Sequence, residues 1–281
     1  STTLMRIFIY LLYMKTKIIN IVNLLLVLTT TVSCEKELEM DYKTVDQLYV
    51  VEAELSNQRT RIAVSKTRQI ENDGNKYGVD GAVIRIMGDD GSEQTLTTST
   101  SGIYTSNTKG VPGVTYRIEV EVDGKRFTSS STMQKTPVVN SARFIWKKVL
   151  NTKVLFADLR IQDFPAETNY YFMHIYRNGL GYRWAVMKDV GNPGEEVQQL
   201  FSCMMEDTDD DDDRLLDGDV MRFEVRAIDK LSYDYLFSMQ QTSSVSTNPI
   251  ANFSGGCLGY FSAYGKTNYS ITFRSDEVEE E

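Results

Sequence analysis

Apolar and polar residues alternate with a period of two at many places along this chain, and helical spacing is almost absent. In residues 116–122, aromatic and aliphatic side chains alternate with arginine and glutamate. Because successive side chains of a β-strand point to opposite faces, this pattern predicts a strand with one buried face. Asp123 and Gly124 follow it, and both accept the positive φ of a tight hairpin turn. The chain is therefore predicted to be all-β.

The first part of the chain is predicted to form one β-sandwich. Seven strands are expected, at 48–55, 60–65, 82–87, 93–98, 102–105, 116–122 and 125–128. Short strands at this spacing are typical of a sandwich, so residues 47–136 are predicted to be an immunoglobulin-like or transthyretin-like domain. Gln134–Pro137 then breaks the pattern and predicts a linker, because proline restricts itself and the preceding residue to extended geometry.

Residues 137–281 are predicted to form a second, consecutive β-sandwich with one short helix. Strands rich in aromatic and β-branched residues are expected at 138–144, 154–161, 169–176, 182–187, 220–228 and 268–273. Residues 231–242 instead show helical spacing, with Ser232 as the candidate N-cap. The glycine-rich stretch 255–259 predicts a turn. The acidic tail from Asp276 is predicted to fray.

Near the start of the sequence, a hydrophobic run follows Lys15 and Lys17 and ends at Ser33-Cys34. The run is too short to span a bilayer, so residues 1–33 are predicted to be an export signal, with 1–13 upstream of the usual start. The two lysines disfavour the alternative, a transmembrane anchor. Cleavage before Cys34 would leave a cysteine for lipidation, and residues 34–46 are predicted to be the lipid anchor and linker.

The predicted location is the outer face of an outer membrane. Glu35-Lys36-Glu37 resembles the surface-export signal that follows the lipidated cysteine in Bacteroidota lipoproteins. The formal net charge is −9, which disfavours nucleic acid as a partner, because phosphate binding relies on lysine and arginine. The acidic chain would also be repelled by an anionic membrane, so the lipid on Cys34 is the expected membrane contact.

Two cysteines remain after Cys34, namely Cys203 and Cys257. In an oxidising compartment a disulfide between them is one prediction. Two buried free thiols are an equally weighted alternative, because sequence does not show whether their Cα atoms approach within disulfide range.

Several motifs in a fixed order resemble a known family. Leu48–Glu52, Gly102–Tyr104 and Pro112–Tyr116 are followed by Asn248-Pro249 and by Gly255–Tyr264. This order resembles the Bacteroidota lipoproteins of domain-of-unknown-function family 4249, over essentially the whole mature chain. Such proteins are commonly encoded beside TonB-dependent outer-membrane receptors. The resemblance therefore implies a role in nutrient uptake and such a receptor as partner.

Catalytic chemistry has little support in the sequence. The aspartate run offers Asp209, Asp211 and Asp213 as a weak calcium candidate, but adjacent like charges more often form a solvated loop, and the glycine and glutamate of an EF-hand are not in place. His174 is the single histidine, and alternation in residues 169–176 predicts that it shares a strand face with Tyr170, Phe172 and Tyr176. Zinc sites usually need three or four nitrogen or sulfur ligands. We therefore expect no metal, no cofactor and no enzymatic activity.

Aromatic residues are the best candidates for binding. Large aromatics stack on sugar rings and carry much of the energy of protein interfaces. The candidates, for a glycan or peptide ligand, are Trp146, Tyr182, Trp184, Tyr260 and Tyr264. Core filling is the favoured alternative for both tryptophans. The sequence thus favours a non-catalytic surface lipoprotein that assists TonB-dependent uptake; the alternatives are an adhesin or glycan-binding protein and, less favoured, a hydrolase.

Overall fold

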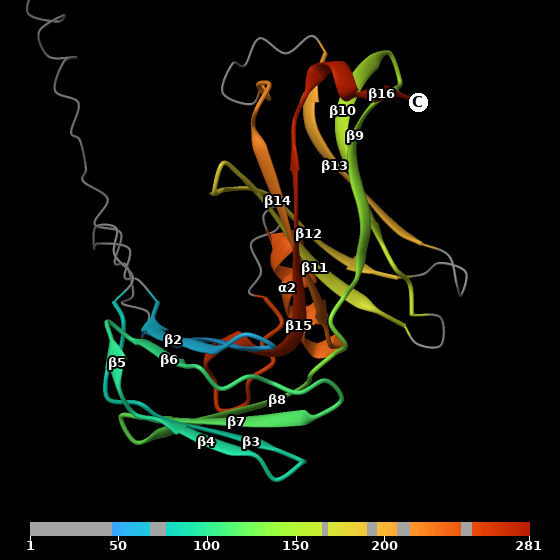
Figure 1. Cartoon of the computed structure of the whole chain (residues 1–281). Helices are drawn as coiled ribbons and strands as arrows, with labels where there is room; N and C mark the ends of the chain where they lie inside the picture. Colours follow the sequence, from blue (N-terminus) through green and yellow to red (C-terminus); the bar gives the residue numbers. More distant parts are fainter. Residues whose placement is uncertain (1–46, 68–76, 165–167, 190–195, 207–213, 243–248) are drawn as a thin grey trace, which may run out of the picture. The chain divides into compact units, whose positions relative to one another are not determined.

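The computed structural model of the chain describes residues 47–67, 77–164, 168–189, 196–206, 214–242 and 249–281 (Figure 1). The predicted export signal, Cys34, and the aspartates Asp209, Asp211 and Asp213 lie outside these residues. The described residues belong to one compact unit, Val45–Glu281. No helix among them combines the length and the apolar character needed to cross a bilayer.

The first half of the chain forms eight strands. They are β1 (Tyr49–Ser56), β2 (Thr60–Lys66), β3 (Val83–Gly88), β4 (Glu93–Leu96), β5 (Ser99–Thr100), β6 (Ile103–Ser106), β7 (Thr115–Val122) and β8 (Lys125–Thr132). All seven predicted strands are present, and the two-residue β5 is additional. Asp123 and Gly124 have φ values of 49° and 72°, which confirms the predicted turn between β7 and β8.

The second half is also mostly strand. It contains β9 (Val139–Val149), β10 (Thr152–Ile161), β11 (Tyr170–Arg177), β12 (Leu180–Lys188), β13 (Val197–Met205), β14 (Val220–Ile228), α2 (Lys230–Thr242), β15 (Leu258–Thr272), the 3-10 turn η1 (Ser275–Glu277) and β16 (Glu279–Glu280). The all-β class and the single α-helix predicted near 231–242 are confirmed for the described residues.

Three sheets organise these strands (Figure 1). The largest has eight strands in the order β12-β11-β14-β15-β1-β2-β6-β5, and the two others have the orders β4-β3-β7-β8 and β13-β10-β9-β16. Strand β15 is shared: its first part, Leu258–Tyr264, pairs in parallel with β1, and its second part, Gly265–Thr272, pairs antiparallel with β14. One continuous sheet therefore runs through both halves of the chain.

The division into two consecutive domains at 47–136 and 137–281 stays a prediction, and β15 connects the two parts. The core of the first half is completed by Phe253, Cys257, Phe261 and Ala263, which all come from the second half. These side chains pack with residues of β1, β2, β3, β7 and β8. The extended connection after β8 lies near the predicted linker. The core of the first half, which precedes this connection, depends on residues more than a hundred positions later in the sequence.

Both cores lie against the same face of the eight-stranded sheet. Odd-numbered residues of β15 include Phe261 and Ala263 in the first core and Ile271 beside the second. The second core also contains Tyr171, Met173 and Ile175 of β11 and the odd-numbered residues of β14, with side chains from β10 and β13. Because side chains alternate along a strand, the even-numbered residues of β11, β14 and β15 lie on the opposite face.

Two predictions at the strand level were wrong. The tail after Asp276 does not simply fray, because β16 pairs in parallel with β9, at Glu279 with Ile145 and at Glu280 with Trp146. The stretch 255–259 is a turn only up to residue 257, since β15 begins at Leu258 and is much longer than the predicted 268–273. Strand β13 was not predicted.

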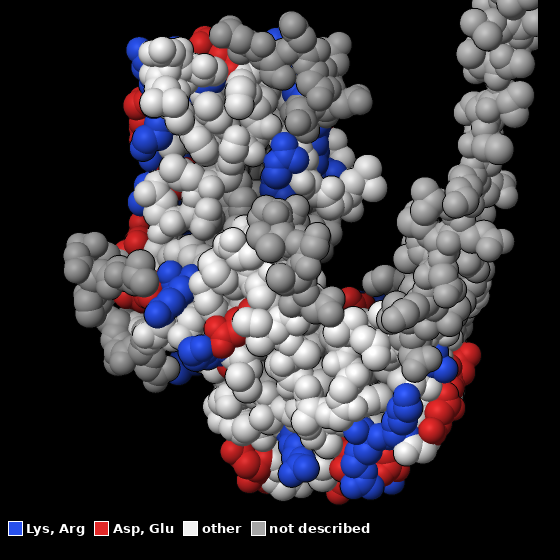
Figure 2. Space-filling view, turned by 180° about the vertical axis from the view of Figure 1, so that it is seen from behind, with Lys and Arg blue, Asp and Glu red and all other residues white. Residues whose placement is uncertain are grey.

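Charged side chains of opposite sign lie close together on the surface. Figure 2 shows blue and red atoms beside one another along the left margin and at the lower end of the face that it displays, whereas the middle of that face is mostly white. On the β4-β3-β7-β8 sheet, for example, Arg85 lies 3.2 Å from Glu119 and Arg126 lies 2.5 Å from Glu121. Arg85 and Arg126 are thus neutralised locally.

Candidate ligand-binding surface

The candidate surface is the face of the eight-stranded sheet that points away from both cores. Helix α2 covers one end of this face and leaves the other end open. Tyr235 and Leu236 of the helix are buried in a third cluster with Val186, Ile228 and Tyr264 of the sheet. The ring of Tyr235 also stacks on that of Tyr260, with centroids 4.8 Å apart.

The N-cap of α2 is Asp229, which corrects the prediction of Ser232. The Asp229 carboxylate accepts the backbone N–H of Ser232 at 2.9 Å, as an N-cap side chain does for the third helical residue. It also accepts the backbone N–H of Thr132 from β8 at 3.0 Å. Ser232 is fully buried and donates its hydroxyl to the carbonyl of Phe261 at 3.3 Å. The helix is therefore fixed to both β8 and β15.

A buried ion-pair network lies beside the helix. The Arg226 guanidinium is 2.7 Å from a carboxylate oxygen of Glu54 and 2.7 Å from one of Glu224. Lys266 lies 3.4 Å from Glu224. The Arg226 side chain is only 13% exposed. Since Glu54 is on β1 and Arg226 on β14, this network connects strands from the two halves of the chain.

Aromatic rings enclose the Arg226 guanidinium. Its central carbon lies 4.6 Å from the ring centroid of Tyr264 and 5.2 Å from that of Phe172. Burial opposes the charge on Arg226, but the neighbouring acidic groups outweigh it and raise its pKa. Burial likewise opposes ionisation of Glu224, and the attraction of Arg226 and Lys266 lowers its pKa below the ordinary value. Both groups are therefore charged at neutral pH.

The open end of the face carries a ladder of rings, which we define as the aromatic ladder: Phe172, His174, Tyr176 and Trp184. The His174 ring stacks on Tyr176, with centroids 4.3 Å apart and planes at 29°. Phe172 meets Trp184 edge to face at 6.1 Å. Arg222 caps the ladder, because its guanidinium carbon lies 3.9 Å from the Tyr176 centroid. Trp184 is 38% exposed.

His174 is neutral at neutral pH. Burial lowers its pKa, Arg226 and Arg222 lower it further, and Glu224 acts in the opposite direction. A neutral imidazole offers one donor and one acceptor nitrogen. Within the described ranges, no group of three or more His, Cys, Asp or Glu residues is arranged to hold a metal ion. The ladder thus combines flat apolar faces with hydrogen-bonding groups and a cation, which suits a polar ligand with a flat apolar side.

The structure does not bring the five predicted aromatic residues together. Tyr260 and Tyr264 lie on the same sheet face as Trp184 but pack under α2. Tyr182 faces the second core and donates its hydroxyl to a backbone carbonyl of β13 at 2.9 Å. Trp146 is half-buried on β9 against the same core. Only Trp184 remains available to a ligand.

Cys203 and Cys257 are free thiols, so the disulfide alternative is wrong and the free-thiol alternative holds. They lie in different cores, Cys203 in the second and Cys257 in the first. Burial raises the pKa of Cys203 to about 11 and that of Cys257 to about 12. Both thiols therefore act as small apolar core residues.

Sequence reasoning missed the charged residues of this face. Arg222, Glu224 and Arg226 occupy alternate positions of a strand whose other residues are apolar. The available signal was the alternation of basic and acidic residues on one face of this strand. A strand face that contacts only water does not need charges of alternating sign. Phe172 and Tyr176 were placed correctly on the face of His174, which the register of β11 confirms.

The sequence from residue 35 to residue 270 matches the family described as Domain of unknown function (DUF4249). The chain belongs to this family. The match covers β1 through nearly all of β15, so the eight-stranded sheet, α2 and the aromatic ladder all lie within the family region. No curated protein matches the sequence.

Two solved structures share a general likeness with this chain. One is a DUF4785 family protein from Legionella pneumophila, with 13% identity and a TM-score of 0.24; the match covers 63% of this chain and 52% of that one. The chain thus spans about half the length of the Legionella protein. The other is a segment of two fibronectin type-III domains from chicken tenascin, with 11% identity, a TM-score of 0.24, and coverage of 81% and 100%. The fold described above rests on the strand pairing itself.

Proposed function

We propose that this protein is a lipid-anchored protein of the outer-membrane surface, which acts without catalysis as the binding or accessory component of a TonB-dependent nutrient uptake system. The aromatic ladder beside Arg222 supports the proposal, because it presents aromatic rings and a cation at the open end of the sheet face. The predicted lipidation of Cys34 and the resemblance to lipoproteins encoded beside such receptors support the location and the partner.

The mechanism is binding close to a transporter. Acyl chains on Cys34 would hold the protein at the membrane, and tethering raises the concentration of the ladder near a receptor without strong intrinsic affinity. The ladder needs little ordering on binding, since its rings already pack on one another and on Arg222. Its expected contact is a ligand on its way to the receptor, or a receptor loop.

The test is affinity purification of the tagged full-length protein from its native outer membrane in mild detergent. A β-barrel receptor in near-equal amount is the expected companion. Cys34→Ala should abolish membrane attachment and the uptake phenotype and leave the melting temperature unchanged. Trp184→Ala should reduce uptake with the anchor intact. Its matched control is Leu150→Ala, which removes a large apolar side chain that is 91% exposed. Recovery of the protein alone, with uptake unaffected by Trp184→Ala, would refute the proposal.

A surface glycan-binding protein or adhesin is the second candidate. The exposed ring of Trp184 favours it, since a flat ring is the surface on which sugar rings stack. Binding to a glycan array that is lost in Trp184→Ala, together with purification without a receptor, would support this second function over the first.

A further inference from the structure

The edge of the β13-β10-β9-β16 sheet is only partly covered. Strand β9 has eleven residues, but β16 pairs with only two of them, Ile145 and Trp146. Among the described residues, the rest of β9 has no strand partner on this side. Edge strands of this kind present backbone groups to any chain that can add to them.

The direction of the backbone groups can be read from the pairing. The carbonyl of Trp146 accepts the N–H of Glu281 at 2.9 Å, so the backbone groups of Trp146 point to the open edge. In an antiparallel pair these directions alternate, so Ala142 and Phe144 point their N–H and C=O groups the same way. Both residues line a cleft of about 350 Å³. Ile271, Thr272, Arg274 and Glu277 also line this cleft.

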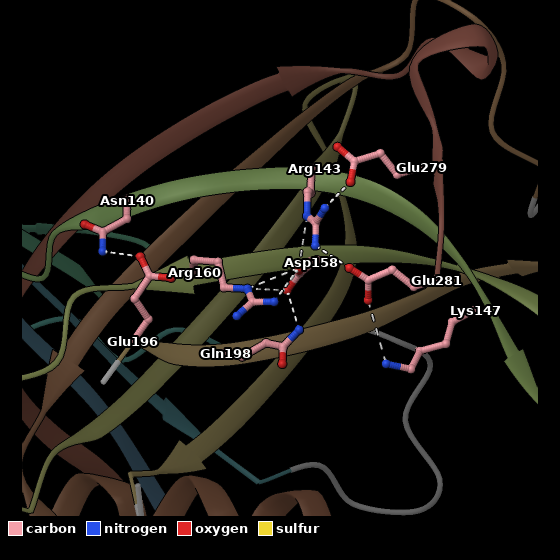
Figure 3. Close-up of polar contacts among 9 residues, drawn as sticks. All are labelled: Asn140, Arg143, Lys147, Asp158, Arg160, Glu196, Gln198, Glu279 and Glu281. Carbon is pink, nitrogen blue, oxygen red and sulfur yellow. Dashed lines mark hydrogen bonds and ion pairs between the residues drawn. The ribbon is translucent and has the colours of Figure 1, made fainter. Parts of the chain in front are cut away.

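Basic side chains make this edge complementary to an acidic strand. Arg143 contacts the carboxylates of Glu279 and Glu281, the latter at 2.5 Å (Figure 3). These two glutamates are two residues apart and therefore share one side of β16. Glu280, which points to the other side, lies 3.0 Å from the Lys153 ammonium group. Glu279, Glu280 and Glu281 thus each have a basic partner.

Arg143 is held in place by a buried carboxylate. Its Nε lies 3.3 Å from an oxygen of Asp158, whose side chain is fully buried. Asp158 is held in turn by Arg160 at 3.0 Å and by the side-chain amide of Gln198 at 2.9 Å (Figure 3). Arg143 is therefore an oriented binding group and not a mobile surface arginine.

The segment that now occupies the edge is weakly held. The side chains of Glu279, Glu280 and Glu281 are 59%, 71% and 36% exposed. Ion pairs between exposed groups contribute little, and a two-residue strand has few backbone hydrogen bonds to lose. A longer strand with the same charges would pair with more of β9 than β16 does.

We propose that the β9 edge is a docking site for an extended acidic segment of a partner protein, which adds in parallel to β9 and replaces β16. Carboxylates at alternate positions of that segment would bind Arg143, and an acidic residue between them would bind Lys153. Residues preceding them would pair with Phe144 and Ala142 and enter the cleft. In the free protein, β16 occupies the site with the same chemistry. This surface is separate from the aromatic ladder.

The test uses the full chain and a fluorescent peptide with the sequence of residues 274–281 as the probe. In Glu279→Gln/Glu281→Gln the edge is vacated more easily, so fluorescence anisotropy should show at least tenfold tighter peptide binding than in the wild type. A peptide in which glutamine replaces each glutamate should not bind. Adding Arg143→Gln should weaken binding at least tenfold, because the buried Asp158 orients Arg143. Adding Lys153→Gln should weaken binding about two- to fivefold, because Lys153 pairs with an exposed carboxylate. Lys153→Gln is needed because Arg143→Gln also disturbs Asp158. Arg126→Gln, on the β4-β3-β7-β8 sheet, is the matched control and should leave peptide binding unchanged.

Equal binding of both peptides, or binding unaffected by both Lys153→Gln and Arg143→Gln, would overturn the proposal. Sedimentation of the wild type tests whether the tail of a second copy of the protein occupies the edge. A dimer that disappears in Arg143→Gln and Lys153→Gln would place the tail of a second copy on this edge and would also overturn it. Trp184, which tests the proposed function, lies on a different sheet from β9. A negative result for the β9 edge would therefore leave the proposed function unaffected.

Discussion

Arg226→Met tests whether the ion-pair network beside α2 stabilises the fold. Methionine keeps most of the volume of the arginine stem but removes the charge that pairs with Glu54 and Glu224. The Glu224 side chain is 8% exposed and the Glu54 side chain is 22% exposed, so both carboxylates would lose their shared arginine partner in a place with little water. Removing one partner of a buried ion pair typically costs about 3–5 kcal/mol.

We expect a loss at the lower end of this range, about 3 kcal/mol in the free energy of unfolding. Lys266 remains 3.4 Å from Glu224 and compensates for part of the lost charge. Replacing the acids as well, in Glu54→Gln/Glu224→Gln/Arg226→Met, should recover at least about 1 kcal/mol, since no uncompensated charge is then buried.

The dependence on pH has a definite sign. The pKa of Glu224 is lowered in the folded protein, so its ionised form contributes stability above its unfolded pKa, and this contribution is lost as the pH falls through the folded pKa. Arg226→Met removes the main cause of that lowering. The difference between wild type and variant should therefore be largest near neutral pH and shrink in acid.

The assay is urea denaturation followed by tryptophan fluorescence, at neutral and acidic pH. Arg222→Met is the matched control on the same strand face. Its side chain is 36% exposed and 3.8 Å from Glu224, so its loss should cost no more than about 1 kcal/mol. If Arg226→Met costs no more than Arg222→Met, the network does not stabilise the fold and the reasoning fails.

Three further predictions concern the shared strand, the thiols and the histidine. Gly259→Ala should lower the unfolding free energy by at least about 3 kcal/mol, because φ is +101° and an added Cβ would lie 2.0 Å from the Val51 carbonyl oxygen. The control Gly256→Ala is also at positive φ, but an added Cβ there has nothing within 4 Å, so it should cost about 1 kcal/mol. Equal losses of the two variants in urea denaturation would contradict this prediction. In a Cys34→Ser background, Cys203 and Cys257 should react with a thiol reagent at about pH 8 only after unfolding, given pKa values of about 11 and about 12, and a reductant should leave the urea midpoint unchanged. Because the pKa of His174 is lowered in the folded state, the protein loses stability as the pH falls through the unfolded value of about 6.5. His174→Gln should therefore lose less stability than the wild type between about pH 7 and about pH 5. Equal losses would show that His174 does not contribute.

Strands that pair with a neighbour in sequence were predictable, because alternation and turn residues are local signals. The hairpin of β7 and β8 is one example, with Asp123 and Gly124 at its turn. The parallel pairing of β1 with β15 was not predictable, since nothing local records a partner that far away. Gly259 also made the start of β15 difficult to predict. Glycine at this position allows close approach to Val51, but in the sequence it resembles a turn residue.

The site was predictable in part. Alternation correctly placed Phe172, His174 and Tyr176 on one face of β11, but it did not reveal what covers that face. Tyr264 became buried because α2 packs on it, and Trp184 stayed open because the helix does not reach it. Tertiary packing, which alternation does not encode, decides which aromatic residue can meet a ligand.

The shared strand β15 also sets the order in which this protein can fold during synthesis. β1 pairs with a segment about 200 residues later, and the first core needs Phe261 and Ala263 from it. When the N-terminal half emerges from the ribosome, its sheet lacks this strand, so the edge of β1 and part of an apolar core stay exposed until the last long strand arrives. Chaperones that bind unfolded chains should therefore bind the first half, and release should follow the arrival of β15.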